Sequence, residues 1–146
     1  MTTLNIGSGQ WVEQEMLNID NGSDYGNPEI MVAYARNYME FDLKRECVFM
    51  LMDGNLLAFK DEVFDKVYSS SCVGYYVDNY AEITRVLKHG GTIELYVWAE
   101  HVPKVIAEMS KYGVCWNKIE WKEDYWPEDE SMDIRLMKMV GKKERY

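Results

Sequence analysis

Two glycines and an acid near the start of the chain are the first residues whose types and spacing could do chemistry. Gly7-Ser8-Gly9 follows the short apolar run Leu4-Asn-Ile6, and Asp20 closes a second apolar run. Glycines at the carboxyl end of a strand let a ligand lie against the backbone, since no side chain is in the way. An acid at the end of the neighbouring strand can accept hydrogen bonds from ribose hydroxyls. The pattern predicts a nucleoside site, although a plain tight turn between two strands would have the same sequence.

The surrounding residues indicate which nucleoside would fit. The dinucleotide fingerprint G-x-G-x-x-G needs a third glycine, but Val12 stands there, and Asp20 follows at about half the usual spacing of ~20 residues. No lysine or arginine occurs before Arg36, so a pyrophosphate would lack positive partners. A nicotinamide-dependent reductase is therefore the weaker alternative. S-adenosylmethionine, a cationic nucleoside without phosphate, fits this region better.

A second pairing of an acid with a glycine follows the next apolar run. The continuous run Cys47–Met52 is typical of a strand covered on both faces in a parallel sheet, and Asp53-Gly54 comes directly after it. By the same logic this pair would face the adenine, although Asp-Gly is also a common turn. The strand predicted over residues 64–71 ends in the hydroxyls of Ser70 and Ser71.

Two helices must position these strand ends. The first is predicted over residues 28–41, where an asparagine cap and a proline precede an apolar stripe at helical spacing. The second begins after Asn79, which forms a capping box with the acid three residues later. Gly90-Gly91 is expected to end that helix, and the next strand is predicted over residues 92–98.

The last third of the chain predicts one more helix and two strands. Pro103 opens the helix and Gly113 ends it, and the strands are expected over residues 114–122 and 132–140 with an acidic loop between them. The whole pattern predicts an α/β fold. We expect a Rossmann-like three-layer sandwich, with a mostly parallel sheet and a C-terminal antiparallel hairpin strand, in a single domain covering residues 1–146.

Composition limits the classes of function. With 146 residues, 47% of them hydrophobic, the chain can bury one substantial core. A net charge of −9 disfavours nucleic-acid binding, which needs clustered lysine and arginine. No stretch reaches the ~20 apolar residues of a membrane span, and Cys47, Cys72 and Cys115 lack C-x-x-C spacing, which favours reduced thiols in a cytoplasmic protein. We expect no metal site, and a homodimer is left open.

Several of these features together resemble a known family. Between about Leu4 and Val97 the chain is similar to the small class I methyltransferases that use S-adenosylmethionine. The close junction of the Gly7 turn to Asp20 resembles a subgroup, methyltransferase type 11-like, with a shortened first crossover. The motifs that carry the resemblance are Asp53-Gly54, Leu57-Ala-Phe59, Phe64-Asp65-x-Val67-x-Ser-Ser and Glu82-x-x-Arg85-Val-Leu-Lys-x-Gly90-Gly91.

The resemblance implies a role for each strand end. It would place the first glycine turn beneath the methionine part of the cofactor, Asp20 at the ribose and Asp53 at the adenine. Many relatives carry a Leu-Glu-His run after the serines, whereas this chain has Val73-Gly-Tyr75. The implied cofactor-binding residues are Asn5, Gly7, Ser8, Gly9, Asp20, Asn21, Asp53, Gly54, Ser70 and Ser71.

Residues at the predicted ends of the fourth and fifth strands would face the methyl acceptor. They are Tyr75, Tyr76, Trp98, Glu100 and His101, unless they simply pack at the rim. We expect methyl transfer from S-adenosylmethionine to an unidentified small-molecule or protein acceptor, with His101 as the candidate base. A catalytically inactive methyltransferase-like binding module is the alternative.

Overall fold

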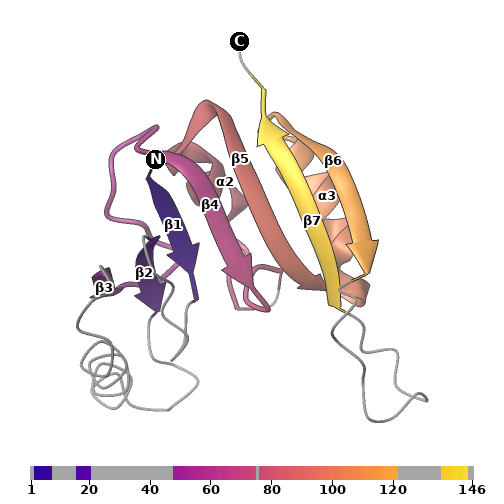
Figure 1. Ribbon diagram of the computed structural model, residues 1–146, viewed down its shortest axis with the longest axis horizontal. Helices are drawn as coiled ribbons and strands as arrows, with labels where there is room; N and C mark the ends of the chain where they lie inside the picture. Colours follow the sequence, from indigo (N-terminus) through magenta and orange to yellow (C-terminus); the bar gives the residue numbers. More distant parts are fainter. Residues whose placement is uncertain (1, 8–15, 21–47, 75, 122–135, 145–146) are drawn as a thin grey trace.

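A computed structural model describes residues 2–7, 16–20, 48–74, 76–121 and 136–144. Within these residues the chain forms one sheet of seven strands, in the order β3-β2-β1-β4-β5-β7-β6 (Figure 1). The strands are β1 (Thr3–Ile6), β2 (Met16–Asp20), β3 (Val48–Leu51), β4 (Phe64–Ser70), β5 (Leu87–Trp98), β6 (Val114–Trp121) and β7 (Leu136–Lys143).

The first five strands run parallel, and the last two form an antiparallel hairpin. β1 pairs in parallel with both β2 and β4, β2 with β3, and β4 with β5. β7 lies antiparallel between β5 and β6. The predicted α/β fold, with its mostly parallel sheet and C-terminal antiparallel hairpin, is confirmed. The strand order reverses at β1, and open α/β sheets bind ligands at such a reversal.

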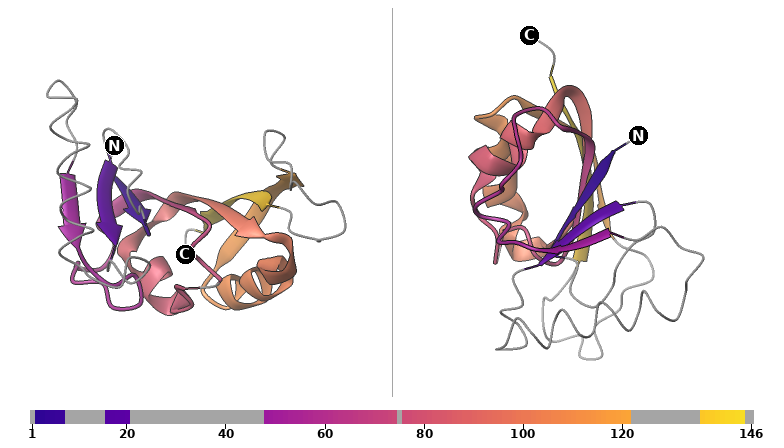
Figure 2. Two further views of the ribbon diagram at one scale, coloured as in Figure 1. Left: turned by 90° about the horizontal axis from the view of Figure 1, so that it is seen from below. Right: turned by 90° about the vertical axis from the view of Figure 1, so that its left-hand side faces the viewer.

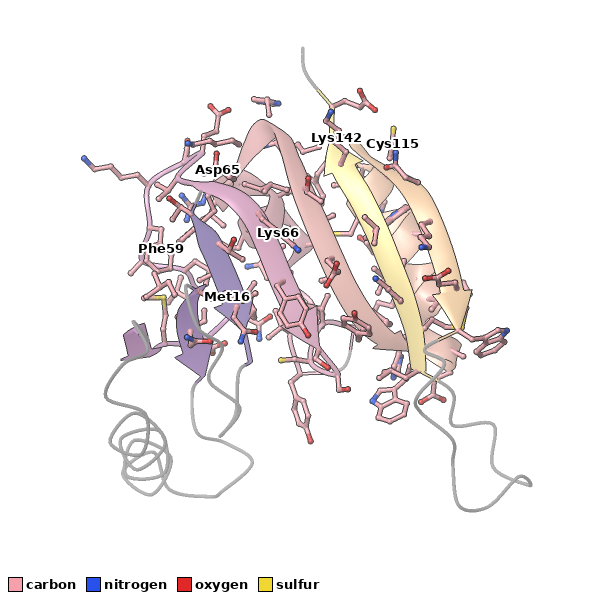
Figure 3. All side chains as sticks on the ribbon, in the orientation of Figure 1. Met16, Phe59, Asp65, Lys66, Cys115 and Lys142 are labelled. Carbon is pink, nitrogen blue, oxygen red and sulfur yellow. The ribbon has the colours of Figure 1, made fainter. Side chains whose placement is uncertain are left out.

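Two helices cover one face of the sheet, α2 (Tyr80–Val86) and α3 (Val102–Ser110), which the short 3-10 helix η2 (Ala99–His101) precedes (Figure 2). Between these helices and the sheet lies an apolar core. Figure 3 shows Lys66 on the opposite face of the sheet. The helix predicted over 28–41, which would form the third layer, lies outside the described residues. Large side chains of the core include Leu4, Ile6, Ile19, Phe64, Ile83, Ile93, Leu95, Met109 and Met139.

The predicted N-terminus of α2 is confirmed, but its predicted end is wrong. The side chain of Asn79 accepts a hydrogen bond from the amide of Glu82, as expected for an N-cap. The helix ends at Val86, because the fully buried Leu87 adopts an extended conformation and pairs with Phe64 of β4. Gly90-Gly91 therefore lies inside β5, and not at a helix end.

Carbonyl groups at the buried end of α2 accept hydrogen bonds from a side chain of β7. Lys143 is only 7% exposed, and its Nζ atom donates to the carbonyls of Thr84 at 2.7 Å and Leu87 at 2.8 Å. Carbonyls at the end of a helix lack helical donors, and a cation there also favours the helix dipole. This lysine replaces the glycine cap that the sequence predicted.

The predicted hairpin is present with shifted bounds. α3 begins at Val102, one residue before the proline that was expected to open it, and Gly113 with φ of 83° provides the turn into β6. β7 extends to Lys143, beyond the predicted end at residue 140, because its register with β5 continues to Lys142. The acidic loop at residues 126–130 lies outside the described residues.

Candidate cofactor and acceptor site

The predicted site residues come together at the carboxyl edge of the parallel strands. Gly7 follows β1 directly, Asp20 is the last residue of β2, and Ser70 is the last residue of β4. In the register of the sheet, Ile6 is opposite both Ile19 and Ser69, so these three strand ends lie side by side (Figure 1). The structure thus brings the glycine turn beside the ends of both neighbouring strands.

The turn after β1 needs glycine for two separate reasons. Gly7 has φ of 66°, a left-handed conformation that residues with a Cβ rarely adopt. A Cβ placed there would also collide with the Sγ atom of Cys72 and lie 2.6 Å from its Cβ atom. The hydroxyl of Ser69 donates to the carbonyl of Ile6 at 2.8 Å and ties this turn to β4. Ser8 and Gly9 lie outside the described residues.

Asn5 lies below the turn, within the sheet. Its side chain is buried, and its Nδ2 atom donates to Oδ1 of Asn18 on β2 at 2.9 Å. Asn18 in turn donates to the carbonyl of Met16. This amide pair joins β1 and β2 in the interior, and it satisfies polar groups that would otherwise be costly to bury. The structure therefore gives Asn5 a bond that positions the glycine turn.

The loop after β3 forms the turn that Asp53-Gly54 predicts. The Oδ1 atom of Asp53 accepts from the amide of Asn55 at 2.9 Å, and the Asp53 carbonyl accepts from the amide of Leu56. Gly54 is buried, and a Cβ there would approach methyl groups of Ile6 and Val77 to 2.8 Å. The glycine therefore lets this loop pack against the end of β1, while Asp53 stays exposed at the edge.

Asn55 connects two loops of the site. Its Nδ2 atom donates to the carbonyl of Tyr76, and its Oδ1 atom accepts from the amides of Asp78 and Asn79. The side chain of Asn79 donates to the Asn55 carbonyl at 2.8 Å. Sequence reasoning missed Asn55, although an asparagine directly after Asp-Gly is a signal for side-chain to backbone bonding.

The end of β4 turns sharply between the two predicted serines. Ser71 has φ of 61°, and its amide donates to the carbonyl of Tyr96 at 2.8 Å. A left-handed conformation in a residue with a Cβ costs about 1 kcal/mol or more, so the neighbouring structure must hold it. Ser70 is half-buried and lies opposite Tyr96 of β5. Strained residues of this kind are common beside functional sites.

The predicted acceptor residues lie around the ends of β4 and β5. Trp98 is the last residue of β5, and Glu100 and His101 lie in η2. The Nε2 atom of His101 lies 3.3 Å from Oε1 of Glu100, and a Cβ on Gly74 would lie 3.2 Å from the His101 Cβ atom. Tyr76 is 51% exposed. His101 is therefore next to the loop that follows the serines, and Tyr75 lies outside the described residues.

Comparison with known proteins decides the family. A family model described as "Methyltransferase domain" matches residues 4–95, which is more than half of the chain. The chain belongs to this family. The human "Probable tRNA methyltransferase 9B" is 29% identical over 121 residues, and its mouse counterpart is 28% identical. These matches cover 79% of this chain but 25% of each relative, so the chain spans about a quarter of the length of the curated relatives.

Solved structures of other proteins share the fold. A chain from the structure titled "Complex between the Haloferax volcanii Trm112 methyltransferase activator and the putative methyltransferase" superposes with a TM-score of 0.73 at 19% identity, covering 99% of this chain and 82% of that one. The YcgJ protein of Bacillus subtilis superposes with a TM-score of 0.74 at 16% identity, covering 99% and 92%. At these identities the likeness shows the fold alone.

The most specific motif of the methyltransferase resemblance stabilises the fold. Arg85 donates to the carbonyls of Phe59 at 2.8 Å and Leu57 at 3.1 Å, and it pairs with Asp61 and Glu82. These two acids raise the pKa of the Arg85 guanidinium above its usual range. Arg85 therefore connects the Leu57-Ala-Phe59 segment to α2.

The structure gives two further observations about possible ligands. Within the ranges that it describes, no group of three or more His, Cys, Asp and Glu side chains is arranged to hold a metal ion. None of the helices in those ranges is long and apolar enough to cross a membrane.

Proposed function

We propose that this chain binds S-adenosylmethionine at the carboxyl edge of β1, β2 and β4 and transfers its methyl group to a small acceptor. The observation that carries the proposal is the convergence of the Gly7 turn, the end of β2 at Asp20 and the Asp53-Gly54 turn beside the strand reversal at β1. Membership of the methyltransferase domain family supports the same cofactor.

The residues present fit this cofactor. The backbone at Gly7 carries no side chain, so the methionine part can lie against the turn with Ser8 and Gly9. Asp20 and Asn21 would hold the ribose hydroxyls, and Asp53-Gly54 the adenine edge. Ser70 and Ser71 would line the other side, and Asn5 would act from below by holding β1 against β2.

In the proposed reaction the protein has two tasks: it aligns the acceptor with the methyl group, and it removes one proton from the acceptor. When bound, S-adenosylmethionine supplies a methyl group on a positively charged sulfur. The aromatic residues Tyr75, Tyr76 and Trp98 would exclude water and orient the acceptor, since in-line transfer depends on alignment. His101 would take the acceptor proton, and Glu100 at 3.3 Å would stabilise the imidazolium that forms.

A second candidate is a domain that binds the nucleoside without turnover. The observation that favours it is the Val73-Gly-Tyr75 run, which stands where many relatives carry Leu-Glu-His. Only the enzyme would need an acid and a base in place of that run, and it would take them from Glu100 and His101 of η2.

The methyl acceptor could be a small molecule or a tRNA. The names of the human and mouse relatives make tRNA the competing acceptor, and a structural neighbour was solved with an activator protein. We favour a small molecule, because a net charge of −9 opposes the phosphate contacts that RNA binding needs. Methyl transfer to tRNA by the chain, alone or with an added activator, would contradict this choice.

Isothermal titration with S-adenosylmethionine tests binding, and release of S-adenosylhomocysteine tests turnover. We expect Asp53→Asn to weaken cofactor binding by about tenfold, since a hydrogen bond that involves a charged group is worth about 1.5 kcal/mol or more. Asp61→Asn is the matched control, because Asp61 contacts Arg85 away from the edge. Equal affinity for both variants would contradict the placement of the adenine.

Turnover assays separate the two candidates. In the enzyme, His101→Ala should retain cofactor binding and lose most of its methyl transfer, because only the base is removed. Cofactor binding by the unaltered chain, with no methyl transfer to any class of acceptor, would instead favour the binding module.

A further inference from the structure

We propose that a second copy of this chain pairs with the outer edge of β6, so that the sheets of the two copies join into one. β6 is the last strand in the order of the sheet, and within the described part of the chain only β7 pairs with it. Figure 3 shows Cys115, the second residue of β6, beside Lys142 of β7. An edge strand presents backbone N–H and C=O groups that can pair with another strand.

The second half of β6 is exposed, and after the register shift between Trp116 and Lys118 its pairing with β7 is regular over residues 118–121. Residues 117–121 are all exposed, and Ile119 and Trp121 are 39% and 50% exposed. Edge strands in monomers usually avoid such apolar side chains, because they favour association with other strands. Ile119 and Trp121 lie on the same face of β6, since successive side chains alternate.

The charges on β6 favour a symmetric register centred on Ile119 over the two adjacent registers. A two-fold axis through Ile119 places this residue opposite its own copy and places each Lys118 opposite Glu120 of the other chain. The two side chains already attract each other within one chain, where Lys118 Nζ lies 3.1 Å from Glu120 Oε1. Moving the axis to Lys118 or to Glu120 would put two like charges directly opposite, which is unfavourable.

This self-complementarity is the reason to choose a second copy over another protein. In a two-fold interface the same patch contacts itself, so each residue must tolerate its symmetric partner. The segment Lys118-Ile119-Glu120 meets that condition in antiparallel pairing, because opposite charges face each other on both sides of an apolar pair. Asn117 lies at the register shift of β6 and is outside this regular pairing.

Sedimentation equilibrium of the full chain, at physiological salt and across the micromolar range, tests the proposal. We expect a concentration-dependent dimer. Lys118→Glu and Glu120→Lys should each weaken it by about tenfold, because each change puts like charges opposite at two symmetric positions. Leu56→Lys, a matched control at another exposed apolar residue, should leave the dimer unchanged.

Mixing the two charge variants gives the sharpest result. In a mixed pair every glutamate faces a lysine, so an equimolar mixture should regain the dimer that neither variant forms well alone. Thermal melts at a dilution where the unaltered chain is also monomeric should be the same for each variant and the unaltered chain, which separates loss of pairing from loss of folding. A monomeric unaltered chain, a mixture that stays monomeric, or an edge that binds only a peptide from another protein would overturn the proposal.

Discussion

The parallel half of the sheet and the antiparallel hairpin are stabilised by different means. At the carboxyl edge of the parallel strands, Gly7 and Gly54 leave room for neighbouring side chains, and Ser69 and Asn55 bond directly to backbone groups of other segments. The end of β6, by contrast, is exposed and pairs with β7 alone within the described residues. Glycines with no room for a Cβ also occur away from that edge, since Gly141 of β7 packs against Trp116 and Gly91 of β5 against Leu87. The two regions therefore differ in how exposed they are and in how their loops are bonded to other segments, and not in close packing alone.

The largest expected effect is at the turn that contains Gly7, compared with the turn at Gly113 that leads into β6. Gly7→Ala should lower the free energy of unfolding by about 3 kcal/mol, since it adds left-handed strain and a collision with Cys72. Gly113→Ala, at the turn into β6, should cost about 1 kcal/mol, for strain alone. Urea unfolding measures both values. Equal losses would show that the Gly7 turn is no more tightly packed than the hairpin turn.

Lys143 tests the contact between the hairpin and α2. Lys143→Met should lower the free energy of unfolding by about 2 kcal/mol, because two carbonyls at the buried end of α2 lose their donor. The cost should be similar to that of Lys143→Leu. A loss as small as that of Lys142→Met, at the exposed neighbour, would show that water satisfies these carbonyls.

The effect of Lys143 should also depend on pH. Burial lowers the pKa of Lys143 below its ordinary value of 10.5. The unfolded chain therefore binds more protons than the folded chain as the pH approaches 10.5, so the contribution of Lys143 to stability rises with pH there. A neutral amine still has two N–H groups for the two carbonyls. The difference in unfolding free energy between the unaltered chain and Lys143→Met should grow over this range.

The smallest effect is expected at Arg85. Arg85→Lys should cost about 1 kcal/mol in stability, because lysine lacks the planar fork that reaches Leu57, Phe59 and Asp61 together. This contact lies away from the carboxyl edge, so the affinity for S-adenosylmethionine should stay the same. A loss of affinity comparable to that of Asp53→Asn would show that the motif supports the site as well as the fold.

Features that depend only on neighbouring residues could be predicted from the sequence. The N-cap at Asn79 and the apolar strands were correct because capping and hydrophobic runs depend on neighbouring residues. The end of α2 was wrong because Lys143, which lies far along the chain, supplies the cap that a nearby glycine was expected to give. Cys72 and Asn55 were missed for the same reason, since their partners are distant in sequence. The roles of the cofactor residues stay predictions.

The position of β7 has a consequence for how the chain is made. β6 is synthesised before β7, yet in the finished sheet β7 separates it from β5. During translation β6 therefore lacks β7, its partner among the described strands, until β7 has left the ribosome, although β1 to β5 can already assemble. In a nascent chain halted between β6 and β7, Ile119 and Trp121 would be accessible to chaperones. The sheet would be complete only after β7 had inserted between β5 and β6.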